Sequence, residues 1–129
     1  MYDPPTLTEL VTAVREFLEE QALPQLEGRT AFHARVAVNA LAIVERQLEL
    51  GPAQDDAELE RLRALLPEVG SLDAANRELC RRIRAGELGL DTPGLREHLR
   101  ETTLAKLSVD QPKYSGYRRA TAARATGSD

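Results

Sequence analysis

The chain has 129 residues, a formal net charge of -4 and one cysteine, Cys80. This length is typical of one domain, and one thiol excludes both an internal disulfide framework and a cysteine-rich metal site. The acidic balance argues against broad electrostatic binding to nucleic acid. Because no apolar stretch approaches the ~20 residues that span a bilayer, and the acidic start is unlike a signal peptide, we expect a cytoplasmic protein with no membrane contact.

The residue types favour helices over strands. Leucine and alanine occur 20 and 18 times, against two phenylalanines and three tyrosines. Strands are normally rich in β-branched and aromatic residues, and the sequence has no run of strict apolar and polar alternation bounded by hairpin signals. We therefore predict an all-α, single-domain bundle of about five helices over residues 1–109, followed by a separate C-terminal segment over 110–129.

Two helices are predicted in the first half. The first opens with a capping box, Thr6-x-x-Glu9, and ends at Pro24. Its apolar residues recur at helical spacing, at Leu7, Leu10, Val11, Val14, Phe17 and Leu18. The second covers about residues 30–50 and is so apolar that we expect it to be the central, most buried element. Gly51-Pro52 predicts its end, since glycine accepts a left-handed C-cap and proline cannot continue a helix.

Three helices are predicted in the second half. A short one begins at Asp55 and is closed by Pro67. The next runs from Ser71 or Leu72 to residue 85, with Gly86 as its cap. Thr92-Pro93 is typical of the N-cap and first position of a last helix.

The C-terminal segment differs in charge from the rest of the chain. Residues 110–129 contain four basic residues against two acidic ones. Tyr114 and Tyr117, beside a proline, favour an extended strap over 110–117 that is ordered against the bundle or a partner. Beyond Ala120 the composition predicts a mobile basic tail.

Polar residues interrupt the apolar second helix at His33, Arg35 and Asn39. A buried Asn or His must be hydrogen-bonded, because leaving it unpaired costs roughly 1–3 kcal/mol. We expect these side chains to tie the helix to neighbouring loops, or to contact a partner chain.

Arginines form a stripe on the fourth predicted helix. Arg77, Arg81 and Arg84 are spaced i, i+4, i+7, and Arg82 lies beside them. Such a stripe can bind a phosphate or an acidic surface, or it can be a solvated face paired with Glu78 and Glu87.

The sequence offers no evident chemistry of its own. It contains no phosphate-binding glycine loop and no metal-ligand spacing, and its two histidines, His33 and His98, lie on different predicted helices. We therefore expect no catalytic residues, no metal, no cofactor and no enzymatic activity of the chain alone.

Several strings carry a resemblance to a known family. They are Val14–Leu18, Gly28-Arg29, FHARVA from Phe32, Asn39-Ala40-Leu41, NRELC from Asn76 and DQPKY from Asp110. Together they resemble a small bacterial domain of unknown function, family 6285, over about residues 3–117. The resemblance includes the small accessory subunit of the levulinate-pathway 4-hydroxyacyl-CoA kinase.

The resemblance implies a partner. Members of the family are typically encoded beside a kinase of the aminoglycoside-phosphotransferase fold and an acyl-CoA dehydrogenase. The expected function is thus a non-catalytic accessory subunit of such a kinase, with the arginine stripe and the tyrosines of the strap as candidate contacts. The family supplies no catalytic residues to carry over.

Two alternatives stay open. The chain could be a helical module that binds an acyl-CoA or another anionic ligand on Arg77, Arg81 and Arg84. It could also be a self-associating bundle, so a homo-oligomer is compatible with the sequence.

Overall fold

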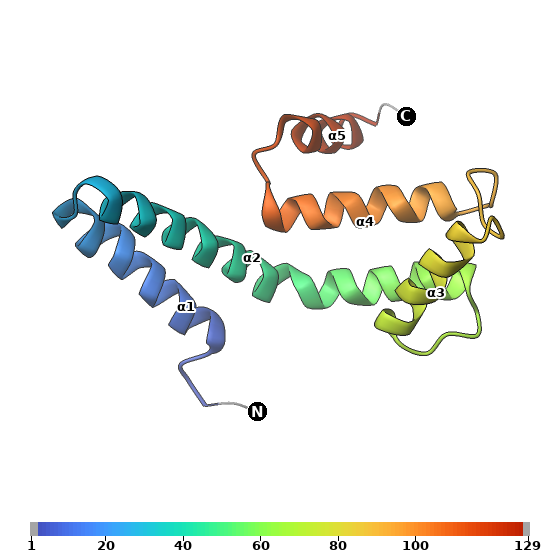
Figure 1. Ribbon diagram of the computed structural model, residues 1–129, viewed down its shortest axis with the longest axis horizontal. Helices are drawn as coiled ribbons and strands as arrows, with labels where there is room; N and C mark the ends of the chain where they lie inside the picture. The colour runs from blue at the N-terminus through green and yellow to red at the C-terminus, as the bar shows by residue number, and fades with distance from the viewer. Residues whose placement is uncertain (1–2, 128–129) are drawn as a thin grey trace. The chain divides into compact units, whose positions relative to one another are not determined.

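The computed structural model of this protein describes residues 3–127. Within them the chain forms five α-helices and no strand, which confirms the all-α class (Figure 1). The chain divides into two compact units, the first ending at Gly51 and the second beginning at Pro52. The helices are α1 (Leu7–Glu16), α2 (Gly28–Leu65), α3 (Leu72–Arg84), α4 (Leu95–Asp110) and α5 (Ser115–Ala125).

In the first unit, α1 begins with the predicted capping box. The backbone N–H of Glu9 donates to the Thr6 hydroxyl at 3.2 Å, and the Thr6 N–H donates to the Glu9 carboxylate at 2.7 Å. Two backbone donors that a helix start leaves free are thereby satisfied, so this prediction is confirmed.

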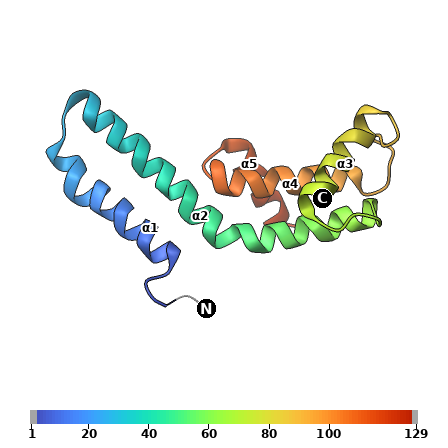
Figure 2. The same cartoon turned by 60° about the horizontal axis from the view of Figure 1, so that its bottom comes forward.

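The chain then reverses direction through two irregular helical stretches. Phe17–Ala22 is a π-helix and Leu23–Gln25, which contains Pro24, is a 3₁₀ turn. This reversal lays α1 beside the first half of α2, as Figures 1 and 2 both show. Arg15 of α1 links the two helices, since its Nε donates to the Glu45 carboxylate of α2 at 2.8 Å.

The predicted break at Gly51-Pro52 is wrong, because α2 continues through both residues to Leu65. A proline inside a helix removes one backbone hydrogen bond and typically costs ~3 kcal/mol. Strong helix formers on both sides, such as Leu50 and Ala53, favour continuation. A tertiary contact adds to this, since the Gln54 amide donates to the Ser108 hydroxyl of α4 at 2.8 Å.

The predicted burial of residues 30–50 is also wrong. Ala31 is the one buried apolar side chain in the described part of the first unit. The core lies in the second unit, where the second half of α2 packs with α3 and the start of α4. Its buried members are Leu62, Leu66, Ala75, Leu79 and Leu95, with Leu65, Val69, Leu72 and Leu88 packed around them.

The predicted start and end of α3 are confirmed. The Ser71 hydroxyl accepts the backbone N–H of Ala74 at 3.3 Å, and Ala85 ends the helix. Gly86 follows with φ +73°, a left-handed conformation that glycine adopts without a Cβ clash.

The predicted start of the next helix, with Thr92 as N-cap and Pro93 as first residue, is wrong by two residues, since α4 begins at Leu95. Its cap is Gly94 with φ +85°. The Thr92 hydroxyl instead accepts the backbone N–H of Gly89 at 2.9 Å. A local turn therefore uses the oxygen that we expected to cap the helix.

The extended strap is not formed. α4 continues to Asp110, a short turn follows, and α5 begins at Ser115 with Tyr114 as its N-cap residue. An ion pair between Arg124 and Glu101 joins α5 to α4. The helix extends to Ala125, past the point where the composition predicts a loss of order, while the mobility of this segment stays a prediction.

Candidate functional site

Exposed apolar side chains are the most prominent surface feature of the first unit. Four of them, Leu7, Leu10, Val14 and Phe17, follow one another along α1 at helical spacing. Leu7 is 68% exposed and Phe17 is 59% exposed. This spacing places them on one face of the helix, so they form a continuous apolar stripe rather than scattered exposed residues. We call these four residues the α1 stripe.

The first half of α2 carries a second exposed apolar set. Phe32 is 59% exposed, and Val36 and Val44 are 49% and 42% exposed. Phe32 and Val36 are one helical turn apart, and Val44 follows two turns later. We call these three residues the α2 face.

The structure leaves most of the apolar stripe predicted for the first helix exposed, because only Val11 and Leu18 of its six residues are partly buried. One α-helix, the first half of α2, lies beside α1 in the described part of this unit (Figure 1). A signal for the exposed stripe was present in the sequence, because the apolar arc of α1 is wider than a single neighbouring helix covers.

The predicted polar cluster of the second helix lies at the surface. His33, Arg35 and Asn39 are all exposed on α2, so the expectation that they are buried is wrong. The His33 ring meets the Phe32 ring edge-on, with centroids 5.5 Å apart. Since these side chains do not hold the interior together, contact with a partner is the role that stays open for them.

The arginine stripe on α3 is engaged by acidic neighbours. Arg81 donates to both oxygens of Glu78 at 2.8 and 2.9 Å, and to both oxygens of Glu87 at 2.9 and 3.0 Å. Arg82 donates to Glu78 at 2.7 Å and also pairs with Glu68. Arg77 pairs with Asp73 at 3.0 Å on the open surface.

This network shifts the pKa values of its glutamates and arginines. The hydrogen bonds from Arg81 and Arg82 lower the pKa of Glu78 from 4.5 to about 2. The same glutamate, together with Glu87, raises the pKa of Arg81. An anionic ligand would have to compete with two carboxylates for the Arg81 guanidinium. This favours the alternative in which the stripe is a solvated face paired with glutamates. The side chain of Arg84 makes no hydrogen bond or ion pair with another residue in 3–127.

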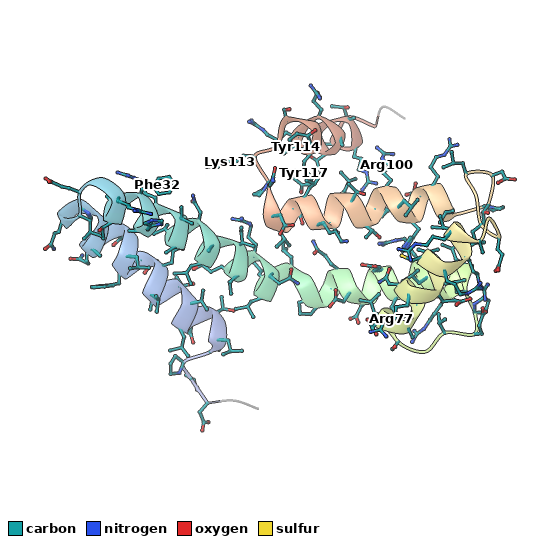
Figure 3. The ribbon with its side chains drawn as sticks, viewed as in Figure 1. Phe32, Arg77, Arg100, Lys113, Tyr114 and Tyr117 are labelled. Carbon is teal, nitrogen blue, oxygen red and sulfur yellow. The ribbon has the colours of Figure 1, made fainter. Side chains whose placement is uncertain are left out.

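The two predicted contact tyrosines lie at the turn between α4 and α5, as Figure 3 shows. Tyr114 is 51% exposed, whereas Tyr117 is half-buried on the first turn of α5. Lys113 precedes them and is exposed, without an ion pair to another described residue. Arg77, a predicted contact residue that Figure 3 also labels, lies on α3 and does not belong to this turn. The structure thus brings Lys113 and the tyrosines together.

Sequence reasoning missed a buried polar group in the second unit. His98 of α4 is 2% exposed, and its Nδ1 has no hydrogen-bond partner among the described residues. Burial and then the nearby Arg61 lower the pKa of His98, while Glu58 opposes this shift. Glu58 itself accepts the Asn76 side-chain N–H at 2.9 Å. The position of His98 one turn after Leu95 was the available signal for its burial.

Residues 3–127 contain no group of three or more His, Cys, Asp or Glu side chains that could hold a metal ion. None of the helices in the same residues has the length and hydropathy needed to cross a membrane.

Comparison with known proteins gives one match. The model of a family described as a domain of unknown function (DUF6285) matches residues 24–114, which is more than half of the chain. Comparisons with curated proteins and with solved structures gave no significant match. The matched range covers α2, α3, α4 and the turn that ends at Tyr114.

Proposed function

The chain belongs to the family of the domain of unknown function DUF6285, and we propose that it acts there as a non-catalytic accessory subunit that binds another protein. The observation that carries the proposal is the exposure of an aromatic side chain at the turn between α4 and α5, where Tyr114 is 51% exposed. An exposed aromatic side chain of this kind commonly anchors a protein interface.

The proposed partner is a cytoplasmic kinase of the aminoglycoside-phosphotransferase fold that phosphorylates hydroxyacyl-CoA thioesters in acyl-CoA catabolism. The resemblance to the accessory subunit of the levulinate-pathway kinase supports this choice. In the proposal the partner supplies the ATP site and the chemistry, and this chain supplies a docking surface.

The proposed contact with the kinase is the turn between α4 and α5, with Lys113, Tyr114 and Tyr117. Tyrosine is among the residues that most often anchor interfaces, because it offers a large apolar ring with a polar end. Tyr114 is half-exposed and held by the backbone at the start of α5, which reduces the entropy lost when a partner orders it. Arg81 is less suited to this role because two glutamates already bind it.

Co-purification of the full chain with the proposed kinase partner tests the proposal. We expect Tyr114→Ala and Lys113→Glu each to weaken the complex at least about tenfold, which corresponds to about 1.4 kcal/mol. Leu90→Ala and Lys106→Glu are matched controls, because both side chains are exposed elsewhere in the second unit, and these variants should bind normally. Failure of the wild-type chain to bind the kinase would refute the proposal, and equal binding by all four variants would refute the assigned contact.

A further inference from the structure

We propose that two copies of this chain pair through their first units, with α1 of each copy lying on the first half of α2 of the other. This inference concerns a different surface from the proposed kinase contact and holds independently of it. The occupant of the exposed surface is a second copy of the chain, and the arrangement is a four-helix interface with two-fold symmetry.

Apolar surface gives the reason for pairing. The α1 stripe and the α2 face expose seven large apolar side chains within 51 residues. Removing apolar surface from water favours association. Two hairpins that exchange these surfaces would cover both sets at once, with the helix-on-helix packing usual in four-helix bundles.

The distribution of charged residues along the two helices indicates what kind of partner fits the exposed surface. The segment Leu7–Ala22, which carries the α1 stripe, contains four glutamates and one arginine. The segment Gly28–Val44, which carries the α2 face, contains Arg29 and Arg35 and no acidic residue. An acidic apolar helix and a basic apolar helix are complementary, and this chain contains both.

The charges needed for such a contact are available. Arg29 and Arg35 form no ion pair with another residue in the described part of the chain, and the same holds for Glu20. Glu16 lies 4.0 Å from the adjacent Arg15, whose closer partners are Glu19 and Glu45 at 2.8 Å. Glu20, Arg29 and Arg35 are therefore not neutralised within one copy, and Glu16 has only the long 4.0 Å contact with Arg15.

Symmetry explains why a second copy satisfies both surfaces. In a two-fold interface, if residue i of one copy meets residue j of the other, then j also meets i. Placing α1 of one copy on α2 of its partner therefore creates the reciprocal contact automatically. Both apolar surfaces and both sets of charges then find partners in a single closed assembly.

Analytical ultracentrifugation of the purified full chain, without kinase, tests the proposal. We expect a monomer–dimer equilibrium that Val14→Glu shifts toward monomer by at least tenfold in the dissociation constant, because the change places a charge within the apolar contact. Leu90→Glu is the control, since Leu90 is exposed in the second unit and should leave the equilibrium unchanged.

Charge reversal tests which helices meet. The pair Glu16→Arg/Glu20→Arg and the pair Arg29→Glu/Arg35→Glu should each weaken the dimer, and the chain carrying all four changes should recover it. Circular dichroism and the thermal midpoint establish that each variant is folded. A wild-type chain that stays monomeric at the highest concentration measured would overturn the proposal. A dimer insensitive to Val14→Glu and to both charge reversals would also overturn it, because the contact would then lie elsewhere.

Discussion

His98 is a buried base in the second unit, and its burial contributes to the way the stability of the protein depends on pH. Its pKa is lowered from 6.5, chiefly by burial. Below its ordinary pKa the unfolded chain takes up a proton that the folded chain resists. The contribution of His98 to stability is therefore fully present above pH 6.5 and is lost as the pH falls toward the lowered value.

We predict that the free energy of unfolding of the wild-type chain falls between pH 7 and pH 5, and that His98→Leu makes this fall smaller. Urea denaturation followed by circular dichroism at several pH values measures both. Other groups titrate in the same range, so the informative quantity is the difference between wild type and variant. An identical pH dependence in the two proteins would show that His98 is not protected from protonation in the folded state.

At the residue scale, hydrogen bonds between residues close in the sequence were predicted correctly. Thr6 and Glu9, or Ser71 and the N–H of Ala74, lie within one turn of each other, so their hydrogen bonds follow from spacing. The same reasoning from spacing failed for Asn39 and His98, whose burial depends on which helix lies opposite. Asn39 proved exposed and His98 buried, although both lie on amphipathic helices.

At the scale of elements, α2 shows how weak a local stop signal can be. Gly51 and Pro52 both disfavour a helix, yet Gly51 has no positive φ and lies inside α2. A Cβ added at Gly51 would lie 2.4 Å from Nε2 of Gln47, at the far end of a flexible side chain that can move away. The backbone at this position therefore accepts alanine.

We predict that Gly51→Ala stabilises the protein by about 0.5–1 kcal/mol, because alanine loses less backbone entropy than glycine when it joins a helix. Gly94→Ala provides the contrast, since its φ of +85° disfavours a Cβ and should destabilise the protein by about 1–2 kcal/mol. Urea denaturation of both variants measures the sign of each change in the free energy of unfolding. Destabilisation by Gly51→Ala would indicate that the helix breaks there, as the sequence pattern predicts.

At the scale of the whole molecule, the proposed function and the ligand-binding alternative differ in what stabilises the fold. A ligand that binds only the folded state raises its stability, by about 2.7 kcal/mol at a concentration of 100 times the dissociation constant. The arginines that such a module would offer to coenzyme A phosphates are largely paired, Arg81 with Glu78 and Glu87.

We therefore predict that a coenzyme A thioester leaves the thermal midpoint of the full chain unchanged, whereas the cognate kinase raises the midpoint of the unfolding step assigned to this chain. Differential scanning calorimetry of chain, kinase and mixture separates the two steps. A concentration-dependent rise with the thioester, abolished by Arg84→Ala, would instead favour the ligand-binding module.

The sequence by itself determined the helical class, the approximate position of most helices and the N-caps at Thr6 and Ser71, because these depend on contacts within one or two turns of the chain. The position of the core, the continuity of α2 past Pro52, the helix at Ser115–Ala125 and the exposure of the α1 stripe were decided by the tertiary structure. The physical reason is that an apolar periodicity shows which face of a helix avoids water and does not show what covers it. Along α2 the same pattern is buried at Leu62 and exposed at Phe32, and what distinguishes them is whether another helix covers that face of α2.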